Sequence, residues 1–307
     1  MVIYVVALKD TKEKLEEIES LLDVDEILST KIDNKRVKDY YNTNSIAYKI
    51  FHNSKGFIHC GISYDGKHKD DDFMNQARYI ERLISDKKPM KILELGGGTG
   101  ANSAFLAKRK PNSEFTVSDI SEKNLKKQKA RTKRLDNLKS VSCDFHDLSQ
   151  FKGKKFDVIF MIETLCHAED KEKVVSEISN VLNEGGRFIL IDGFYERPPK
   201  TEIEKKVARL MEIGMSVGEF ESYTRMKRFI TKNNMKIEEE IDWSDNVIPS
   251  MMMQERRAKR FFESKFISKL LIRILPGLFY YNALSGYLMP NSVKEDIATY
   301  NLICAIK

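Results

Sequence analysis

Short apolar runs alternate with amphipathic stretches through the middle of the chain. Five runs rich in Ile, Val, Leu and Phe have the length of strands: 91–95, 114–120, 140–145, 156–162 and 187–194. Stretches with helical spacing follow several of them, at 101–109, 121–135 and 170–182. Parallel strands need crossover connections, which are usually helices, and they are buried on both faces. The pattern therefore predicts an α/β fold with a mainly parallel sheet and helices on both faces.

The remaining segments extend this picture toward both ends of the chain. Residues 235–243 and 298–306 predict two more strands, seven in all, and no helix needs to follow the last one. The sheet is therefore expected to close with an antiparallel last strand. Helices are predicted at 200–213 and 217–233, and over most of 254–289 with a break at Pro276-Gly277.

The first 75 residues show weaker patterning. Residues 2–8, VIYVVAL, have the composition of a strand, and residues 11–28 have mostly helical spacing. Residues 31–75 are polar, aromatic and irregular, and a helix is predicted over 72–86 because an acidic run at 70–72 suits a helix start. Residues 1–30 contain no motif that we can assign to a family.

Composition limits the broad class of protein. The 307 residues are 41% hydrophobic and 32% charged, which provides a sizeable core and excludes general disorder. A net charge of +6 permits an anionic partner but does not require one. Four scattered cysteines indicate reduced thiols, and neither a signal peptide nor an uncharged run long enough to span a membrane is apparent. These features lead us to expect a cytoplasmic protein.

The strongest chemical signal is ILELGGGTG at residues 92–100. Glycine occupies the alternate positions 96, 98 and 100, and Glu94 lies two residues before the first of them. A strand that turns tightly into a helix against a ligand needs glycine there, because side chains would collide with that ligand. The helix start that follows offers free N–H groups and a positive dipole end.

Polar residues follow the next strands at the same predicted sheet edge. Asp119 ends the second strand and can accept hydrogen bonds from two ribose hydroxyls. Asp144 and Phe145 follow the third strand, where they can meet an adenine amino group and ring. A further motif, IETLCHAED, follows the fourth strand. Together these positions predict a nucleoside cofactor site. Gly96, Gly98 and Ala101 also satisfy the G-x-G-x-x-A pattern of NAD sites, but the acid before the glycines and the closing hairpin favour S-adenosylmethionine.

On these motifs the sequence resembles a class I S-adenosylmethionine-dependent methyltransferase, which implies a Rossmann-like fold over residues 75–307. Residues 1–74 are then an N-terminal segment and helical cap, and about 244–296 are a helical insertion before the last strand. The resemblance implies that Glu94 and the glycine loop meet the methionine part of the cofactor and that Asp119 holds its ribose. The implied cofactor-binding residues are Glu94, Gly96, Gly97, Gly98, Gly100, Asp119, Ile120, Asp144, Phe145 and Ile162.

Three further segments are similar to the small-molecule branch that contains the tocopherol, sterol and cyclopropane-lipid enzymes. They are DYYNTNSIAYKIF, GFIHCGISYDG and IETLCHAED, which begin at residues 39, 56 and 162. This resemblance implies that an aromatic segment with Tyr40 or Tyr41, together with Gly61 and Ile62, closes over the cofactor. It also implies that the insertion shapes the pocket for a small, hydrophobic acceptor.

Candidate catalytic residues follow from the chemistry of methyl transfer. A weak acceptor needs a base, and Glu163 and His167 are four residues apart, so they share a face if their loop is helical. Tyr41 is a third candidate, and His59 and Tyr195 are secondary candidates. Cys143, His146, Asp147, Cys166 and His167 match no standard ligand spacing, so no metal is expected.

Two other functions stay open. The basic stretch 123–134 could follow phosphates, which would suit an RNA or protein methyltransferase. The motif after the fourth strand lacks the prolines that are typical of nucleic-acid methyltransferases, so nucleic acid is not the expected partner. The other open function is that of a non-catalytic partner protein that keeps the cofactor fold.

Residues 254–275 combine an apolar repeat with basic residues, so this helix either covers the site as a lid or contacts an anionic membrane. The oligomeric state is not predicted.

Overall fold

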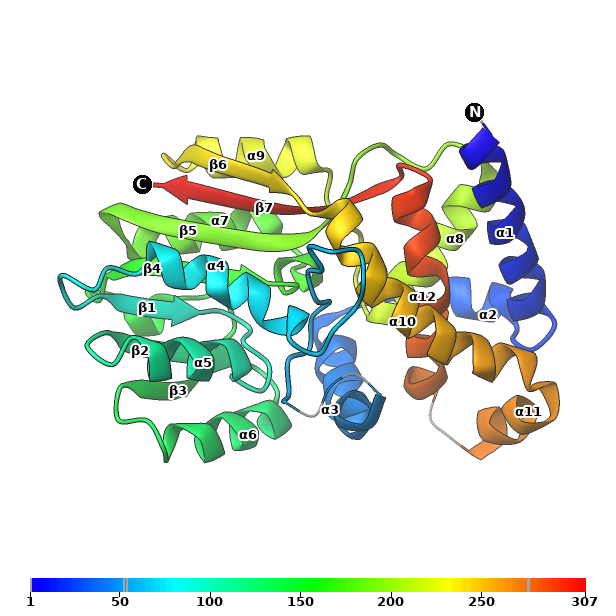
Figure 1. The fold of residues 1–307 in the computed structure, drawn as a ribbon, viewed down its shortest axis with the longest axis horizontal. Helices are drawn as coiled ribbons and strands as arrows, with labels where there is room; N and C mark the ends of the chain where they lie inside the picture. The colour runs from blue at the N-terminus through cyan, green and yellow to red at the C-terminus, as the bar shows by residue number, and fades with distance from the viewer. Residues whose placement is uncertain (1, 52, 54, 275–276) are drawn as a thin grey trace.

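The computed structural model describes residues 2–51, 53, 55–274 and 277–307. Its centre is one seven-stranded sheet with the strand order β3-β2-β1-β4-β5-β7-β6 (Figure 1). Strands β1 to β5 are parallel, and β7 runs antiparallel to both β5 and β6. The α/β fold with an antiparallel last strand, predicted from the alternation of patterns, is confirmed. The strands are β1 (Lys91–Glu94), β2 (Glu114–Asp119), β3 (Leu138–Ser142), β4 (Phe156–Ile162), β5 (Leu182–Tyr195), β6 (Lys236–Asp242) and β7 (Ala298–Ile306).

Helices cover both faces of this sheet because the central strands are apolar on both sides. Ile92, Phe160 and Ile189 point to one face, where they join a core with α4 (Asn75–Leu83) and α5 (Ala101–Arg109). Their chain neighbours Leu93 and Met161 point to the other face, against α7 (Lys171–Val181) and α9 (Tyr223–Lys232). Helix α6 (Glu122–Thr132) packs near the sheet edge formed by β2 and β3. Alternate residues of one strand thus support two separate cores.

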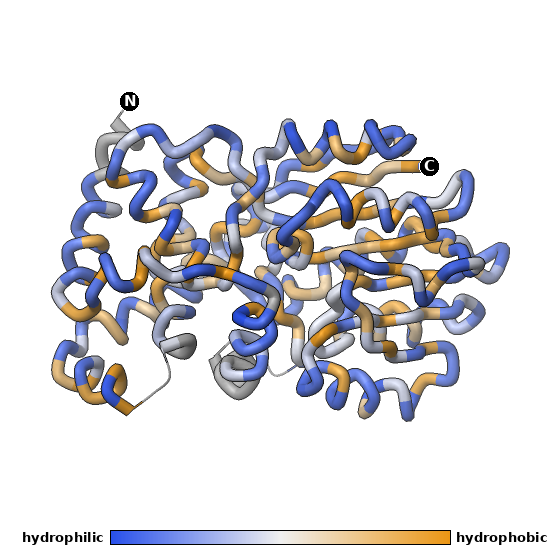
Figure 2. The backbone as a smooth tube through the Cα atoms, turned by 180° about the vertical axis from the view of Figure 1, so that it is seen from behind, coloured by the Kyte–Doolittle hydropathy of each residue, from blue (hydrophilic) through white to orange (hydrophobic). Residues whose placement is uncertain are grey.

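A second layer of helices lies beyond the carboxyl end of the parallel strands, as Figures 1 and 2 show from opposite sides. Segments far apart in the chain form one apolar cluster there, with Ile18, Leu210, Phe262 and Leu288 at its centre. Two prolines lie inside these helices, at Pro249 and Pro290. The helices are α1 (Val2–Glu19), α2 (Val24–Leu28), α3 (Asn34–Phe51), α8 (Glu202–Met215), α10 (Ser244–Glu263), α11 (Lys265–Ile274) and α12 (Gly277–Lys294).

The N-terminal segment differs from the sequence prediction. The strand predicted at residues 2–8 is wrong, because these residues form the first two turns of α1. β-Branched residues cost a helix only a few tenths of a kcal/mol each, and the helical pattern that follows extends back through them. Helix α1 also lies on the far side of the helical layer from the sheet, so neither edge strand, β3 or β6, is within reach for pairing (Figure 1). The irregular structure predicted over 31–75 is wrong for residues 34–51, which form α3.

Buried polar contacts tie α1 to the helices before the last strand. Lys14, which is 4% exposed, donates to the carboxylate of Glu255 on α10 and to Asn291 Oδ1 on α12 at 2.5 Å. Asp10 lies 3.1 Å from the same ammonium group. The helices predicted over 254–289 are confirmed, and the break predicted at Pro276-Gly277 falls partly outside the described residues. The N-terminal and insertion helices therefore pack as one layer over the sheet edge.

Candidate active site

The glycine-rich loop between β1 and α5 passes very close to the loop after β4. Gly96, Gly98 and Gly100 have φ angles of +61°, +54° and +75°, a region that favours glycine. A Cβ on Gly96 would lie 2.2 Å from Cγ2 of Thr164, and one on Gly98 would lie 2.8 Å from Ile58. The loop therefore has no room for a side chain at Gly96, and a side chain at Gly98 would displace the end of Ile58.

Gly100 serves a different purpose from the other glycines of the motif. It is the N-cap of α5, and a Cβ there would lie 3.2 Å from Gln128 on α6. It does not line the cavity that Gly96, Gly97 and Gly98 line. The glycine at this position allows α5 and α6 to pack closely. The resemblance implies that Gly100 contacts the cofactor, but Gly100 lies outside the cavity.

Asp119 lies at the carboxyl end of β2 and is almost fully buried. Its Oδ2 accepts a hydrogen bond from the Gly98 N–H at 2.9 Å, and its Oδ1 accepts one from the Ser121 N–H at 2.7 Å. The Asn124 amide donates to Oδ2 at 3.2 Å. Burial raises the pKa of Asp119 to about 6, although these three donors favour the charged form. The carboxylate is thus held rigidly beside the glycine loop.

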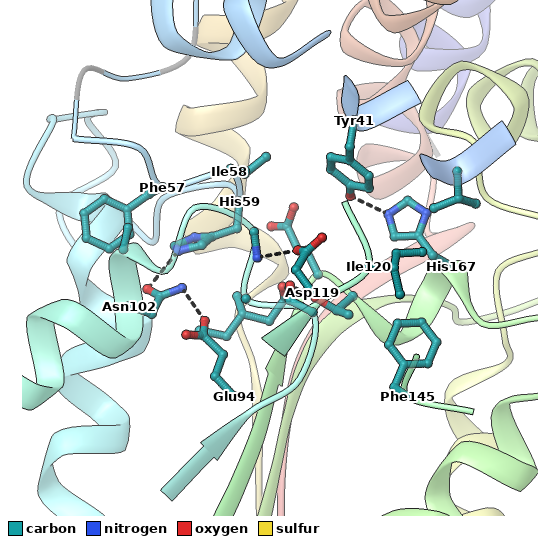
Figure 3. A pocket seen from close by; sticks show the side chains of 18 of the residues that line it. Tyr41, Phe57, Ile58, His59, Glu94, Asn102, Asp119, Ile120, Phe145 and His167 are labelled. Carbon is teal, nitrogen blue, oxygen red and sulfur yellow. Dashed lines mark hydrogen bonds between the residues drawn. The ribbon is translucent and has the colours of Figure 1, made fainter. Parts of the chain in front are cut away.

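Glu94 has a similar arrangement at the end of β1. Its Oε2 accepts hydrogen bonds from the N–H of Ser103 at 3.1 Å and from the Ser103 hydroxyl. Asn102 donates to Oε1 at 3.3 Å and lies 3.2 Å from Nε2 of His59 (Figure 3). Burial raises the pKa of Glu94 to about 7.

Twelve of the thirteen predicted site residues line a single cavity at this edge of the sheet, which we call the first cavity (Figure 3). Phe145 and Ile120 lie at one end, and Glu94 and Asn102 lie at the other. Segment 56–59 and α3, which carries Tyr41, also line it. The predicted residues in it are Tyr41, Glu94, Gly96, Gly97, Gly98, Asp119, Ile120, Asp144, Phe145, Ile162, Glu163 and His167.

A second cavity adjoins the first and has a different lining. Most of its wall is apolar and comes from the helical layer and from β5, with Phe194, Met211, Met215, Met251 and Met289 among its residues. Cys60, Asp192 and Tyr300 are among its polar residues. Tyr41, Ile58, Glu163 and His167 line both cavities, so these four side chains form a shared wall.

Glu163 follows β4 directly and lies in this shared wall. Its backbone φ is +47°, a strained region for a residue other than glycine, and its N–H donates to the Ile191 carbonyl at 2.8 Å. Oε1 accepts hydrogen bonds from the Cys60 N–H at 2.8 Å and the Tyr300 hydroxyl at 2.9 Å. Oε2 takes part in neither of these two hydrogen bonds. Burial raises the pKa of Glu163 to about 7.

His167 and Tyr41 meet across the same wall. The Tyr41 hydroxyl lies 2.8 Å from Nε2 of His167, and Nδ1 lies 3.2 Å from the Ser216 carbonyl. A carbonyl only accepts, so Nδ1 carries the proton and Nε2 accepts from Tyr41. Burial lowers the pKa of His167 to about 4 and raises that of Tyr41 well above 10.0. His167 is therefore neutral at physiological pH, and its short 3₁₀ turn places it on the same side as Glu163.

Several residues of the two cavities escaped the sequence analysis. Asp192 accepts hydrogen bonds from the N–H groups of Cys166 and Gly193 at 3.0 and 2.9 Å, and its position in a strand ending LIDGF could have indicated it. Tyr300 comes from the middle of an apolar strand, where no local signal marks it. Of the secondary candidates, His59 lines the first cavity, whereas Tyr195 lines neither and donates to Glu212 at 2.8 Å.

Comparison with known proteins places this geometry in a family. A family model described as a methyltransferase domain matches residues 86–263, which is more than half of the chain. The chain belongs to this methyltransferase-domain family. The family predicted from the glycine loop and the strand-end acids is therefore confirmed.

Individual relatives are more distant. The chain is 29% identical to an S-adenosyl-L-methionine-dependent Diels-Alderase from Talaromyces variabilis, over 60% of this chain and 64% of that protein. It is 26% identical to a sterol 24-C-methyltransferase from Kluyveromyces lactis, over 69% of this chain and 58% of that one. The chain thus spans less than two thirds of the length of these curated relatives. The cyclopropane synthase MmaA2 from Mycobacterium tuberculosis shares the fold, with a TM-score of 0.74 at 11% identity, over 90% of this chain and 99% of that one.

Two negative observations complete the description of the site. The described residues contain no group of three or more His, Cys, Asp or Glu side chains that could hold a metal ion. Within the same part of the chain, no helix has the length and apolarity needed to cross a bilayer.

Proposed function

We propose that the first cavity binds S-adenosylmethionine and that the chain transfers its methyl group to a small, hydrophobic acceptor in the second cavity. The observation that carries this proposal is the shared wall of Tyr41, Ile58, Glu163 and His167 between the two cavities. A group-transfer enzyme needs two ligand sites that meet at one point, and a weak acceptor also needs a base there.

The residues of the first cavity suit this cofactor. Asp119 is a buried carboxylate whose charged form gains from hydroxyl donors, as the two hydroxyls of a ribose would be. Gly96, Gly97 and Gly98 contribute backbone to the wall of the cavity, and Phe145, Ile120 and Ile162 offer apolar surface for an adenine ring. The cofactor, when bound, supplies a methyl group on a sulfonium for direct displacement.

Glu163 is the residue that we assign as the base. Its Oε1 is occupied by two donors, and Oε2 is the oxygen that would take a proton from the acceptor. A carboxyl pKa of about 7 is well matched to proton transfer near neutral pH, because the group is then both ionised and basic enough. Tyr300 and the Cys60 N–H hold the carboxylate in place.

Tyr41 and His167 have a positioning role in this proposal. His167 is neutral and its Nε2 accepts from the Tyr41 hydroxyl, so the pair joins α3 to the loop after β4 and covers the contact between the cavities. Covering that contact excludes water, which strengthens the electrostatic interactions of Glu163 with an acceptor.

The second cavity indicates the class of acceptor. Four methionines provide a flexible apolar lining, which adapts to irregular hydrophobic molecules. The acceptor also carries a polar or nucleophilic group that reaches Glu163, and the carboxylate of Asp192 lies in the same cavity. A sterol-like, terpenoid or fatty molecule with one such group fits this lining. The names of the relatives support this class over the RNA or protein alternative.

A second candidate function is a cyclisation that needs the bound cofactor but no methyl transfer. One relative is named as a Diels-Alderase and one structural neighbour as a [4+2]-cyclase. The largely apolar second cavity would favour such a reaction by holding the acceptor in a folded shape. The two candidates differ in whether S-adenosylhomocysteine is produced.

Calorimetric titration of the purified chain tests the proposal. We expect micromolar binding of S-adenosylmethionine, no binding of NAD, and a loss of at least tenfold in affinity for Asp119→Ala. Asp136→Ala, which changes an exposed acid of the same region, is the matched control and keeps the affinity. Absence of S-adenosylmethionine binding by the wild-type chain would overturn the proposal.

A screen of lipophilic acceptors then separates the candidates. Methyl transfer predicts formation of S-adenosylhomocysteine in a one-to-one ratio with methylated product, and loss of both in Glu163→Gln. Conversion of an acceptor to an isomer of equal mass, with no S-adenosylhomocysteine formed, would favour cyclisation instead.

A further inference from the structure

Helix α11 carries four of the six large hydrophobic side chains that are exposed among the described residues, the other two being Tyr64 and Ile203. Phe266 is 85% exposed, Ile274 is 67%, Ile267 is 57% and Leu270 is 51%. These four side chains belong to one helix of ten residues, which lies at the corner of the helical layer away from the sheet (Figure 1). Isolated exposed apolar residues are common, but a row of four large ones is not.

The exposed apolar side chains form one stripe. Successive residues of a helix are about 100° apart, so Phe266, Leu270 and Ile274 lie about 160° to 240° around the helix from Ser268. Ser268 is buried and its hydroxyl donates to the Phe261 carbonyl of α10, which identifies the side of α11 that faces the protein. The apolar stripe therefore points away from the body of the molecule.

Basic residues form a second stripe along one border of the first. Lys265, Lys269 and Arg273 are exposed and lie about 60° to 140° around the helix from Ser268. Helix α11 contains no acidic residue. Cations beside an apolar stripe are the arrangement of helices that lie in a membrane surface, where aliphatic stems follow the apolar region and charged ends reach the phosphates.

The charge of the chain is concentrated in the same region. Residues 256–273 contain seven basic and one acidic residue, a net charge of +6. The whole chain also has a net charge of +6, so the remaining sequence is neutral as a set. Arg256, Arg257, Lys259 and Arg260 are all exposed on the end of α10 next to α11. This surface is therefore complementary to an anionic partner.

We infer that α11, together with the basic end of α10, docks on the surface of an anionic lipid bilayer. Charge alone would also suit an acidic protein or a nucleic acid, but neither needs an apolar stripe that projects from the molecule beside the cations. A ten-residue helix is about 15 Å long, which allows it to lie in the membrane surface but not to cross it.

Two helices connect the docking surface to the second cavity. Helices α10 and α12 flank α11 in the chain, and their residues Met251, Met289 and Val293 line that cavity. Met251 lies 14 positions before the first residue of α11, and Met289 lies 12 positions after the first residue of α12, so the cavity is about 20 Å from α11 along these helices. The docking rests on the surface alone and not on the function proposed above.

Sedimentation with vesicles tests the docking. The full chain is mixed with vesicles of phosphatidylcholine, or of equal parts phosphatidylcholine and phosphatidylglycerol. We expect binding to the anionic vesicles that is at least tenfold stronger than to the neutral ones, because each basic side chain near the surface contributes about a fivefold gain.

Two triple variants separate the apolar and the charged contributions. Phe266→Ala/Leu270→Ala/Ile274→Ala keeps the helix, because alanine is the best helix former, and is expected to lose binding at least tenfold. Lys265→Gln/Lys269→Gln/Arg273→Gln is expected to lose binding by tenfold or more. The matched control is Lys126→Gln/Lys129→Gln/Lys133→Gln, which removes three exposed charges from the basic stretch on and just after α6 and is expected to keep most of the binding.

Several results would overturn this inference. They are failure of the wild-type chain to bind anionic vesicles, unchanged binding by the apolar triple variant, and an equal loss in the α6 and α11 charge variants. A dimer that dissociates in the apolar triple variant, with no vesicle binding by the wild type, would assign the stripe to a second copy of the chain. S-adenosylmethionine titration of each variant is run in parallel, so that a failure of docking is distinguished from a failure of the proposed function or of folding.

Discussion

The hydroxyl of Tyr41 lies 2.8 Å from Nε2 of His167, and this contact joins α3 to the loop after β4 across 126 positions of the chain. Both side chains line the two cavities, and both are half-buried. His167 is neutral there, so the contact is a hydrogen bond between uncharged groups, worth about 1 kcal/mol.

Tyr41→Phe tests the importance of this contact for cofactor retention. The variant keeps the ring but leaves Nε2 of His167 without that donor, so we expect about a fivefold to tenfold weaker affinity for S-adenosylmethionine, mainly through faster dissociation. Stopped-flow measurement of cofactor release checks this. Tyr40→Phe removes a neighbouring hydroxyl that donates to Asn282 at 2.9 Å, and is the control. Equal effects of both substitutions would show that α3 acts only as a packed element.

Gly96→Ala tests the close approach of the glycine loop to Thr164. The new Cβ would lie 2.2 Å from Cγ2 of Thr164 at a φ of +61°, so both a clash and backbone strain are introduced. We expect the free energy of unfolding to fall by about 2–4 kcal/mol. Adding Thr164→Ser removes Cγ2 and is expected to restore the part that is due to the clash. Denaturant unfolding measures both changes.

Gly153→Ala provides the matched reference for that experiment. Gly153 has a φ of +78° and nothing within 4 Å of an added Cβ, so its substitution reports backbone strain alone, about 1 kcal/mol. If Thr164→Ser failed to improve Gly96→Ala, the contact between the two loops would not be the source of the loss.

Glu163→Gln tests the raised pKa of the proposed base through stability. The unfolded chain releases this proton near its ordinary pKa of 4.5, and the folded chain keeps it up to about 7. Between these values the folded state binds more protons, so the wild-type stability falls as pH rises through this window. Glutamine never ionises, so the variant should gain up to about 3 kcal/mol relative to wild type between pH 4.5 and 8.

Thermal unfolding at several pH values measures this difference. The gain of Glu163→Gln over wild type should be small near pH 4.5 and greatest above pH 7. Glu219→Gln, at an exposed position, should show no such dependence. A difference between Glu163→Gln and wild type that stays constant with pH would contradict the raised pKa.

Met215→Trp tests the separation of the two cavities. Met215 is half-buried at the end of α8 and lines only the second cavity, so a larger side chain there reduces the space for an acceptor. We expect the affinity for S-adenosylmethionine to change less than twofold, while binding of a fluorescent apolar probe falls at least fivefold. A parallel loss of both would indicate that the cavities behave as one site.

The sheet and the cofactor side of the site could be predicted for a shared physical reason. Strands such as 156–162 are apolar on both faces and short, and this pattern distinguishes them from helices without any tertiary information. The carboxyl ends of parallel strands meet at one edge, so Glu94, Asp119 and Glu163 could be brought together from chain order alone. Gly100 shows the limit of this reasoning, because a glycine in a motif also serves helix packing.

Other parts depended on contacts that no local pattern encodes. Residues 2–8 have the composition of a strand but form helix α1, because no sheet edge is near them and the following turns are helical. Tyr300 lies in an apolar strand 137 positions from Glu163, and only the pairing of β7 with β5 brings its hydroxyl to that carboxylate.

The sequence by itself determined the order of strands and helices after residue 71, the glycine loop and the acids at the strand ends, because these depend on periodicity and on steric limits within a few residues. Only the tertiary structure decided that Tyr41 meets His167, that Asp192 and Tyr300 enter the second cavity, and that the apolar stripe of α11 faces outward. Which face of a helix is covered depends on what packs against it, and the partners of these helices lie in distant parts of the chain.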